Sequence, residues 1–84
     1  MTSTQAKRIL SRNIDALLRR KGWSRYRLAQ ESGITEATIS NIMNEKHEPR
    51  ISVLVTLATA MGVSANRLIA GYREESEKIL AESA

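Results

Sequence analysis

Several small side chains that can form hydrogen bonds recur on one side of a predicted helix over residues 35–44. Glu36, Ser40 and Asn41 offer a carboxylate, a hydroxyl and an amide, and Asn44 follows at helical spacing. An ordinary solvated helix face carries long Lys, Glu and Arg side chains instead. Short polar side chains suit a helix that lies close against another surface and binds it through hydrogen bonds.

The residue types that carry catalysis or bind metals do not form a recognisable set. The sequence has no Ser-His-Asp arrangement, no glycine-rich phosphate loop and no paired carboxylates on an interior face. His47 is the only histidine and there is no cysteine, and a lone imidazole among scattered carboxylates is a poor metal site. We therefore expect no enzyme activity, no metal and no cofactor, and no small-molecule ligand is evident.

Two short helices joined by a tight turn, over residues 24–44, are expected to position these side chains. Ser24 and Thr35 are good N-caps, because a hydroxyl there can accept from a free amide of the first turn. The capping box at Ser24 is incomplete, since Arg27 stands where Glu or Gln would reach back. Gly33 follows the first helix, where a left-handed residue commonly ends one.

Apolar residues at helical spacing predict further helices on both sides of this pair. A helix over residues 6–21, a fourth over 52–61 and a short fifth over 64–69 are expected, and residues 73–82 could form a sixth. No strand pattern is visible, so the prediction is an all-α fold of five helices with a possible sixth. The residues expected to face the core are Leu10, Ile14, Leu17, Leu18, Leu28, Ala29, Ile34, Ile39, Ile42, Met43, Val53, Leu54, Leu57, Ala58, Met61 and Leu68.

The charge is unevenly distributed along these 84 residues, whose formal net charge is +4. Residues 1–71 hold eleven Lys or Arg against five Asp or Glu, a net of +6, whereas residues 72–84 have a net of −2. A basic body suits a polyanion, and we expect the acidic tail to face away from it. No apolar run is long enough to cross a membrane and no signal peptide is visible, so the cytoplasm is the expected location.

The sequence resembles the helix-turn-helix of the lambda-repressor/Cro-like family, also called the Xre family. The matching residues are Ala29, Gly33 and Ile39, with Leu28, Ile34 and Ile42 around them. The resemblance covers the chain from about Leu10 to Ile69. It implies a compact five-helix domain that binds a double-stranded DNA operator, with the helix over about 35–44 as the recognition helix in the major groove.

The resemblance implies two groups of DNA-binding residues. The base-facing group is Arg25, Thr35, Glu36, Ala37, Ser40, Asn41 and Asn44. The phosphate-binding group is Ser24, Arg27, Lys46, His47 and Arg50. Two alternatives stay open: Glu36 could merely stabilise the start of its helix, and Arg25, where the family usually has Gln, could bind either phosphate or guanine.

The resemblance also implies a sequence-specific transcriptional regulator, most simply a phage- or prophage-type repressor or a Cro-like protein, bacterial or phage-encoded and nucleoid-associated. Such a protein would bind a palindromic operator as a homodimer. The domains expected are a disordered N-terminus (1–5), a DNA-binding domain (6–71) and an acidic tail (72–84) that could form a helix and take part in dimerisation. The residues expected in the dimer interface are Leu68, Ile69, Tyr72, Ile79 and Leu80. The alternative is an antitoxin that binds a toxin, with the acidic tail as its binding segment.

Overall fold

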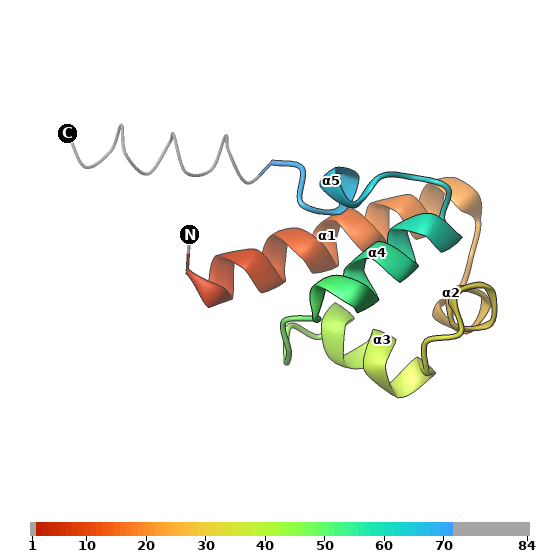
Figure 1. Ribbon diagram of the computed structural model, residues 1–84, viewed down its shortest axis with the longest axis horizontal. Helices are drawn as coiled ribbons and strands as arrows, with labels where there is room; N and C mark the ends of the chain where they lie inside the picture. Colours follow the sequence, from red (N-terminus) through yellow and green to blue (C-terminus); the bar gives the residue numbers. More distant parts are fainter. Residues whose placement is uncertain (1, 72–84) are drawn as a thin grey trace.

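The structure of the protein is a computed structural model that describes residues 2–71, and these residues form five α-helices and no strand (Figure 1). The helices are α1 (Ser3–Lys21), α2 (Arg25–Ser32), α3 (Glu36–Met43), α4 (Ile51–Ala60) and α5 (Ala65–Leu68). The longest helix, α1, packs against both α3 and α5, while α4 packs against α2 and α5. The predicted all-α fold of five helices is confirmed, and the possible sixth helix lies outside the described residues.

The first helix begins earlier than the sequence analysis predicted. The Thr2 hydroxyl accepts from the Gln5 amide at 3.2 Å, and the Gln5 side-chain oxygen accepts from the Thr2 amide at 2.9 Å. This reciprocal pair is a complete capping box, which satisfies two amides that a helix start leaves free. The sequence analysis assigned residues 1–5 to a disordered N-terminus and began this helix at Ala6, whereas in the structure α1 begins at Ser3.

The core is formed by apolar side chains from all five helices. Leu28, Leu57 and Leu68 are completely buried, and burial of one such side chain contributes about 1.5–3 kcal/mol. Of the predicted core residues, Ala29, Ile34, Met43, Val53 and Leu54 are only partly buried against it. Ile9, which the sequence analysis did not count, is also buried.

Three helices end in the same way, with one residue in the left-handed conformation and an amide beyond it that donates back to the last turn. Gly22 and Gly62 fill this position after α1 and α4, with φ of +68° and +73°. After α3 the residue is Glu45, with φ of +60°, and the Lys46 amide donates to the Asn41 carbonyl at 2.9 Å. These bonds form a Schellman motif, which is normally closed by glycine, so α3 ends on a strained non-glycine residue.

The end of α5 is tied to the middle of α1 by one side chain. The Asn13 amide nitrogen donates to the carbonyl oxygens of Leu68 and Ala70, both at 2.8 Å. These bonds satisfy carbonyls that the end of a four-residue helix leaves free. Asn13 therefore fixes the direction in which the chain leaves the domain.

Candidate nucleic-acid interface

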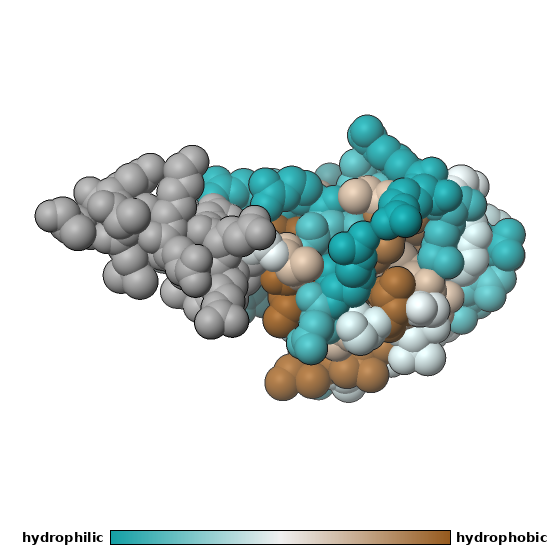
Figure 2. Space-filling model, turned by 90° about the horizontal axis from the view of Figure 1, so that it is seen from above, coloured by the Kyte–Doolittle hydropathy of each residue, from teal (hydrophilic) through white to brown (hydrophobic). Residues whose placement is uncertain are grey.

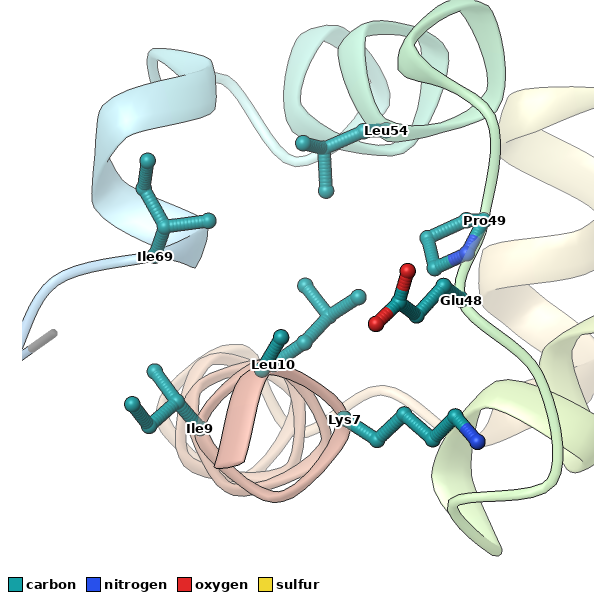
Figure 3. Close-up of a pocket in the computed structure, with 8 residues that line it drawn as sticks. Lys7, Ile9, Leu10, Glu48, Pro49, Leu54 and Ile69 are labelled. Atoms are coloured by element: carbon teal, nitrogen blue, oxygen red, sulfur yellow. The ribbon is translucent and has the colours of Figure 1, made fainter. Parts of the chain in front are cut away.

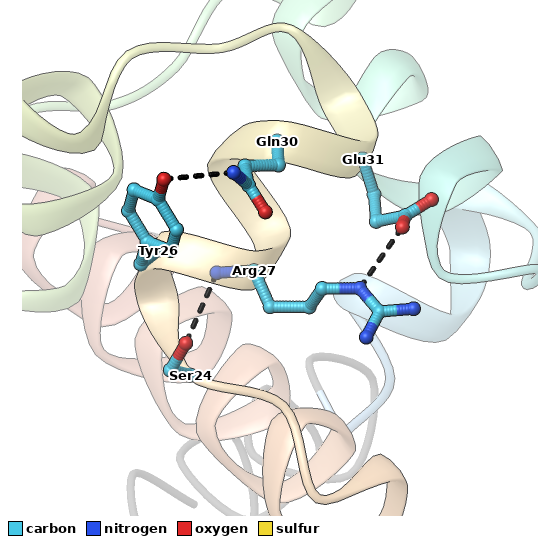
Figure 4. Close-up of polar contacts among 5 residues, drawn as sticks. All are labelled: Ser24, Tyr26, Arg27, Gln30 and Glu31. Atoms are coloured by element: carbon cyan, nitrogen blue, oxygen red, sulfur yellow. Dashed lines mark hydrogen bonds and ion pairs between the residues drawn. The ribbon is translucent and has the colours of Figure 1, made fainter.

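The two helices at residues 24–44 are held by the caps that the sequence predicts. The Ser24 hydroxyl accepts from the Arg27 amide at 3.0 Å (Figure 4), and the Thr35 hydroxyl accepts from the Thr38 amide at 3.2 Å. Gly33 has φ of +75° and its amide donates to the Ala29 carbonyl at 2.9 Å. The predicted turn between α2 and α3 is thus confirmed at its caps and at its glycine.

One side of α3 presents the short polar residues singled out above, and we call it the reading face. It consists of Glu36, Ala37, Ser40, Asn41 and Asn44. Glu36, Ala37 and Asn44 are exposed, and Ser40 and Asn41 are half-buried. Within residues 2–71 no hydrogen bond or ion pair occupies the side chains of this face. Its donors and acceptors are therefore available to an external surface.

Thr35 differs from the other predicted base-facing residues. Its hydroxyl accepts from the Thr38 amide and also donates to the Thr38 hydroxyl oxygen at 2.9 Å. Both functions of this hydroxyl are thus used within α3, so Thr35 is placed as a helix cap.

A groove of about 230 Å³ lies between α3 and the segment that follows it. It brings together Asn41, His47 and Arg50, which the sequence analysis assigned separately to base and phosphate contacts. The full lining is Thr38, Asn41, Ile42, His47, Glu48, Pro49, Arg50 and Val53. Thr38 was missed, although it lies three positions before Asn41 and hence on the adjacent side of the same helix.

Arg27 is placed differently from the other predicted phosphate-binding residues. Its guanidinium carbon lies 4.8 Å from the centroid of the Trp23 ring, and its Nε is 2.9 Å from a carboxylate oxygen of Glu31 (Figure 4). The Lys21 ammonium lies 5.0 Å from the same ring centroid. The Arg27 charge is therefore partnered within the domain, whereas the side chains of Arg25 and Lys46 are exposed and make no described contact.

The positive charge predicted for the whole body is concentrated on one helix. Within residues 24–50 four basic side chains are balanced by four acidic ones. On α1 there are six basic side chains against one acidic side chain, Asp15, which pairs with Arg19 at 3.0 Å. Long-range attraction of a polyanion would therefore originate mainly from α1, while the reading face supplies hydrogen-bonding groups and no positive charge.

The residues predicted for a dimer interface divide into three groups. Leu68 is completely buried in the core, so its assignment to a dimer interface was wrong. Ile69 is 41% exposed, and Tyr72, Ile79 and Leu80 lie outside the described residues. The exposed aliphatic residues that the sequence analysis missed are Ile51 and Val55, which share one side of α4 because they are four positions apart. Figure 2, seen from the α5 side, shows hydrophobic side chains at the surface of the described part.

Ile69 also borders an apolar hollow between α1 and the C-terminal half of the domain. The hollow has a volume of about 150 Å³, and Ile9, Leu10 and Leu54 line it together with Pro49 (Figure 3).

In the described part of the chain, no cluster of histidine and acidic residues could hold a metal ion. No helix among residues 2–71 is long and apolar enough to cross a membrane.

Comparison with known proteins agrees with this arrangement. The chain is 31% identical over 62 residues to the HTH-type transcriptional regulator SutR of Escherichia coli (strain K12), which covers 74% of this chain and 35% of that protein. The chain thus spans about a third of the length of that relative.

Two solved structures share the fold. One is an HTH_3 family transcriptional regulator from Vibrio cholerae, with a TM-score of 0.78 and 23% identity over 82% of this chain and 39% of that chain. The other is a hypothetical transcription factor, NHTF, from Neisseria, with a TM-score of 0.78 and 23% identity over 92% of this chain and 88% of that chain. The helix-turn-helix family HTH_3 matches residues 14–68. The resemblance to lambda-repressor/Cro-like proteins is confirmed, and the chain belongs to the HTH_3 helix-turn-helix family.

Proposed function

We propose that this protein regulates transcription by binding double-stranded DNA, with α3 in the major groove. The observation that carries the proposal is the reading face, whose short polar side chains have no partner within residues 2–71. A recognition helix needs such side chains, because they must reach the edges of bases at close range. The printed name of the Escherichia coli relative, an HTH-type transcriptional regulator, supports the same function.

The reading face supplies the base contacts in this proposal. The Asn41 amide can bind adenine at N6 and N7, and Ser40 can donate to or accept from a base edge. Glu36 can accept from cytosine N4, although it also lies in the first turn of α3, where the helix dipole favours an anion. Arg25, at the exposed start of α2, reaches a phosphate or a guanine.

The phosphate contacts come from the ends of the two helices and from the segment after α3. Ser24, Lys46, His47 and Arg50 are the proposed phosphate-binding residues. Arg27 is not included, because Glu31 and the Trp23 ring already partner its guanidinium.

We further propose that two copies bind two half-sites of a palindromic operator and repress transcription by occupying it. One recognition helix reads only a few base pairs, whereas a two-fold dimer reads twice as many. The side chains of Ile51, Val55 and Ile69 are aliphatic and exposed. This supports the proposal that a second copy of the chain packs against the C-terminal half of the domain. The antitoxin alternative depends on residues 72–84, and nothing among residues 2–71 favours it.

The proposal is tested by selecting binding sites from a random duplex library. We expect one enriched sequence with two-fold symmetry. Asn41→Ala should lose about 1–3 kcal/mol of discrimination at one base position of each half-site and keep its affinity for random DNA. Thr59→Ala, an exposed α4 position with no proposed role, is the matched control. A library without enrichment, or equal losses of Asn41→Ala on selected and random DNA, would contradict the proposed reading helix.

A further inference from the structure

The groove beside α3 contains two donor side chains, those of His47 and Arg50, that base recognition does not require. Thr38 and Asn41 line it from α3, and His47 and Arg50 line it from the following segment. Its volume of about 230 Å³ is several times the roughly 30 Å³ that a water molecule occupies in the liquid. The groove therefore has room for a group as large as a phosphate.

The polar side chains of the segment between α3 and α4 lie in two different hollows. The Glu48 carboxylate points into the apolar hollow against α1, where Lys7 also lies (Figure 3). His47 and Arg50 line the groove on the α3 side instead. Glu48 contributes to both linings, but its carboxylate lies in the other hollow, so Arg50 is the charged side chain left in the groove beside the His47 imidazole.

The surroundings of His47 contain few other groups that could change charge near neutral pH. From α3 the groove is lined by Thr38, Asn41 and Ile42, and from the first turn of α4 by Val53, none of which titrates. The charged neighbours along the chain are Glu45, Lys46, Glu48 and Arg50. Among side-chain types, the imidazole is the one suited to changing charge between pH 5 and 8.

We propose that this groove binds one backbone phosphate of the duplex and that His47 does so as the imidazolium, so that DNA binding takes up a proton. This inference rests on the proposed DNA-binding function. An adjacent anion stabilises the charged form of an imidazole. The neutral form must therefore gain a proton from solution when the phosphate arrives, and by linkage the affinity falls as pH rises.

The size of the effect follows from linkage. If the phosphate makes protonation of an ordinary imidazole tenfold more favourable, affinity falls about sixfold per subunit between pH 6 and pH 8. A dimer that takes up two protons would show about the square of that change. Phosphodiester groups do not titrate in this range, and the variants below assign the proton to His47.

The experiment measures the affinity of the full chain for its selected duplex at pH 6, 7 and 8 and constant ionic strength. The wild type should weaken with rising pH. His47→Gln, which keeps a hydrogen-bond donor but no titrating charge, should bind at all three pH values as the wild type does at pH 8. His47→Lys should bind at all three as the wild type does at pH 6. Circular dichroism at each pH confirms that both variants remain folded.

The outcomes separate this inference from the function on which it rests. Absence of duplex binding at every pH would remove the proposed function itself. A wild type that binds equally at pH 6 and pH 8, or a His47→Gln variant that keeps the wild-type pH dependence, would overturn the proton uptake and leave the DNA-binding proposal intact.

The phosphate itself can be located by replacing single phosphates of the duplex with neutral methylphosphonates. When the same position is replaced in both half-sites, one such position should abolish the pH dependence of the wild type, and replacements at other positions should preserve it. A pH dependence that survives replacement at every position would overturn the assignment of His47 to one phosphate.

Discussion

The guanidinium of Arg27 lies against the ring of Trp23, with its central carbon 4.8 Å from the ring centroid. Its Nε also pairs with Glu31 at 2.9 Å. Arg27 thus ties the turn between α1 and α2 to the last turn of α2. Its neighbour Arg25 makes no described contact, so two arginines on the same helix are expected to have different roles.

Arg27→Ala should reduce stability, and Arg25→Ala should reduce DNA affinity. Loss of the stacking and the exposed ion pair should lower the free energy of unfolding by about 1 kcal/mol. Arg25→Ala should leave that free energy within about 0.5 kcal/mol. Urea denaturation followed by the fluorescence of Trp23, the only tryptophan, measures the first effect. Duplex titration measures the second, and the reverse pattern would restore Arg27 to the phosphate-binding set.

Glu45→Gly should stabilise the protein. A left-handed non-glycine residue costs about 1–2 kcal/mol, and the equivalent position after two other helices is already glycine. Because glycine also has more freedom in the unfolded chain, the expected net gain is about 0.5–1 kcal/mol. It would appear as a higher denaturation midpoint at an unchanged m-value. Gly62→Ala is the matched control, and we expect it to lose stability. A less stable Glu45→Gly variant would show that the Glu45 side chain makes a favourable interaction.

Gly33→Val should destabilise the fold by about 1–3 kcal/mol, because a β-branched residue is poorly tolerated at positive φ. No other atom lies within 4 Å of a Cβ placed there, so the cost arises from the backbone and not from a clash. Gly33→Asn should therefore cost clearly less, since asparagine tolerates this conformation. Thermal denaturation of both variants tests the assignment, which would be wrong if Asn and Val were equally harmful.

Asn13→Asp should be more harmful than Asn13→Ala. Alanine removes two hydrogen bonds to the carbonyls of Leu68 and Ala70, at a cost of about 1–3 kcal/mol. An aspartate can only accept, so it would place its negative charge against two carbonyl oxygens. Hydrogen exchange of the Ile69 amide should accelerate in both variants. Equal stability of the two would mean that the donor function of Asn13 is unimportant.

The parts of this structure that follow from local chemistry could be predicted from the sequence. The hydroxyl caps at Ser24 and Thr35 and the glycine turn at Gly33 require only neighbouring residues, and all three are confirmed. The capping box of Thr2 and Gln5 could also have been predicted, because the sequence contains its signature, Thr-x-x-Gln. It was missed because the polar segment was interpreted as a disordered N-terminus.

Features that depend on tertiary placement could not be predicted in the same way. Helical spacing places Ile51 and Val55 on one side of α4, but it does not say whether another helix covers that side. Likewise, the Arg27 side chain could have extended to solvent, and only its position beside Trp23 gives it a partner. The groove at His47 depends on Glu45, whose left-handed backbone brings the following segment against α3, and a glutamate there gives no turn signal.

The last prediction concerns the surface through which two copies would associate. Ile51 and Val55 project from α4, and Ile69 follows α5 beside an apolar hollow. A substitution at an exposed aliphatic position should leave the buried core undisturbed. A charged residue there would oppose burial against a second copy, because each copy would have to desolvate a carboxylate. A two-fold interface contains the substituted position twice, so the effect on association is doubled.

Val55→Asp and Ile69→Asp should therefore weaken dimerisation in sedimentation experiments and lower affinity for a duplex with two half-sites about one helical turn, roughly 34 Å, apart. Affinity for a single half-site should remain unchanged. Thr4→Asp, an exposed polar position in the first turn of α1, is the matched control and should dimerise as the wild type does. Loss with Ile69→Asp alone would restrict the interface to the chain after α5, and loss with Val55→Asp alone would restrict it to α4. A wild type that sediments as a monomer and binds one asymmetric site with full affinity would contradict the dimer proposal as a whole.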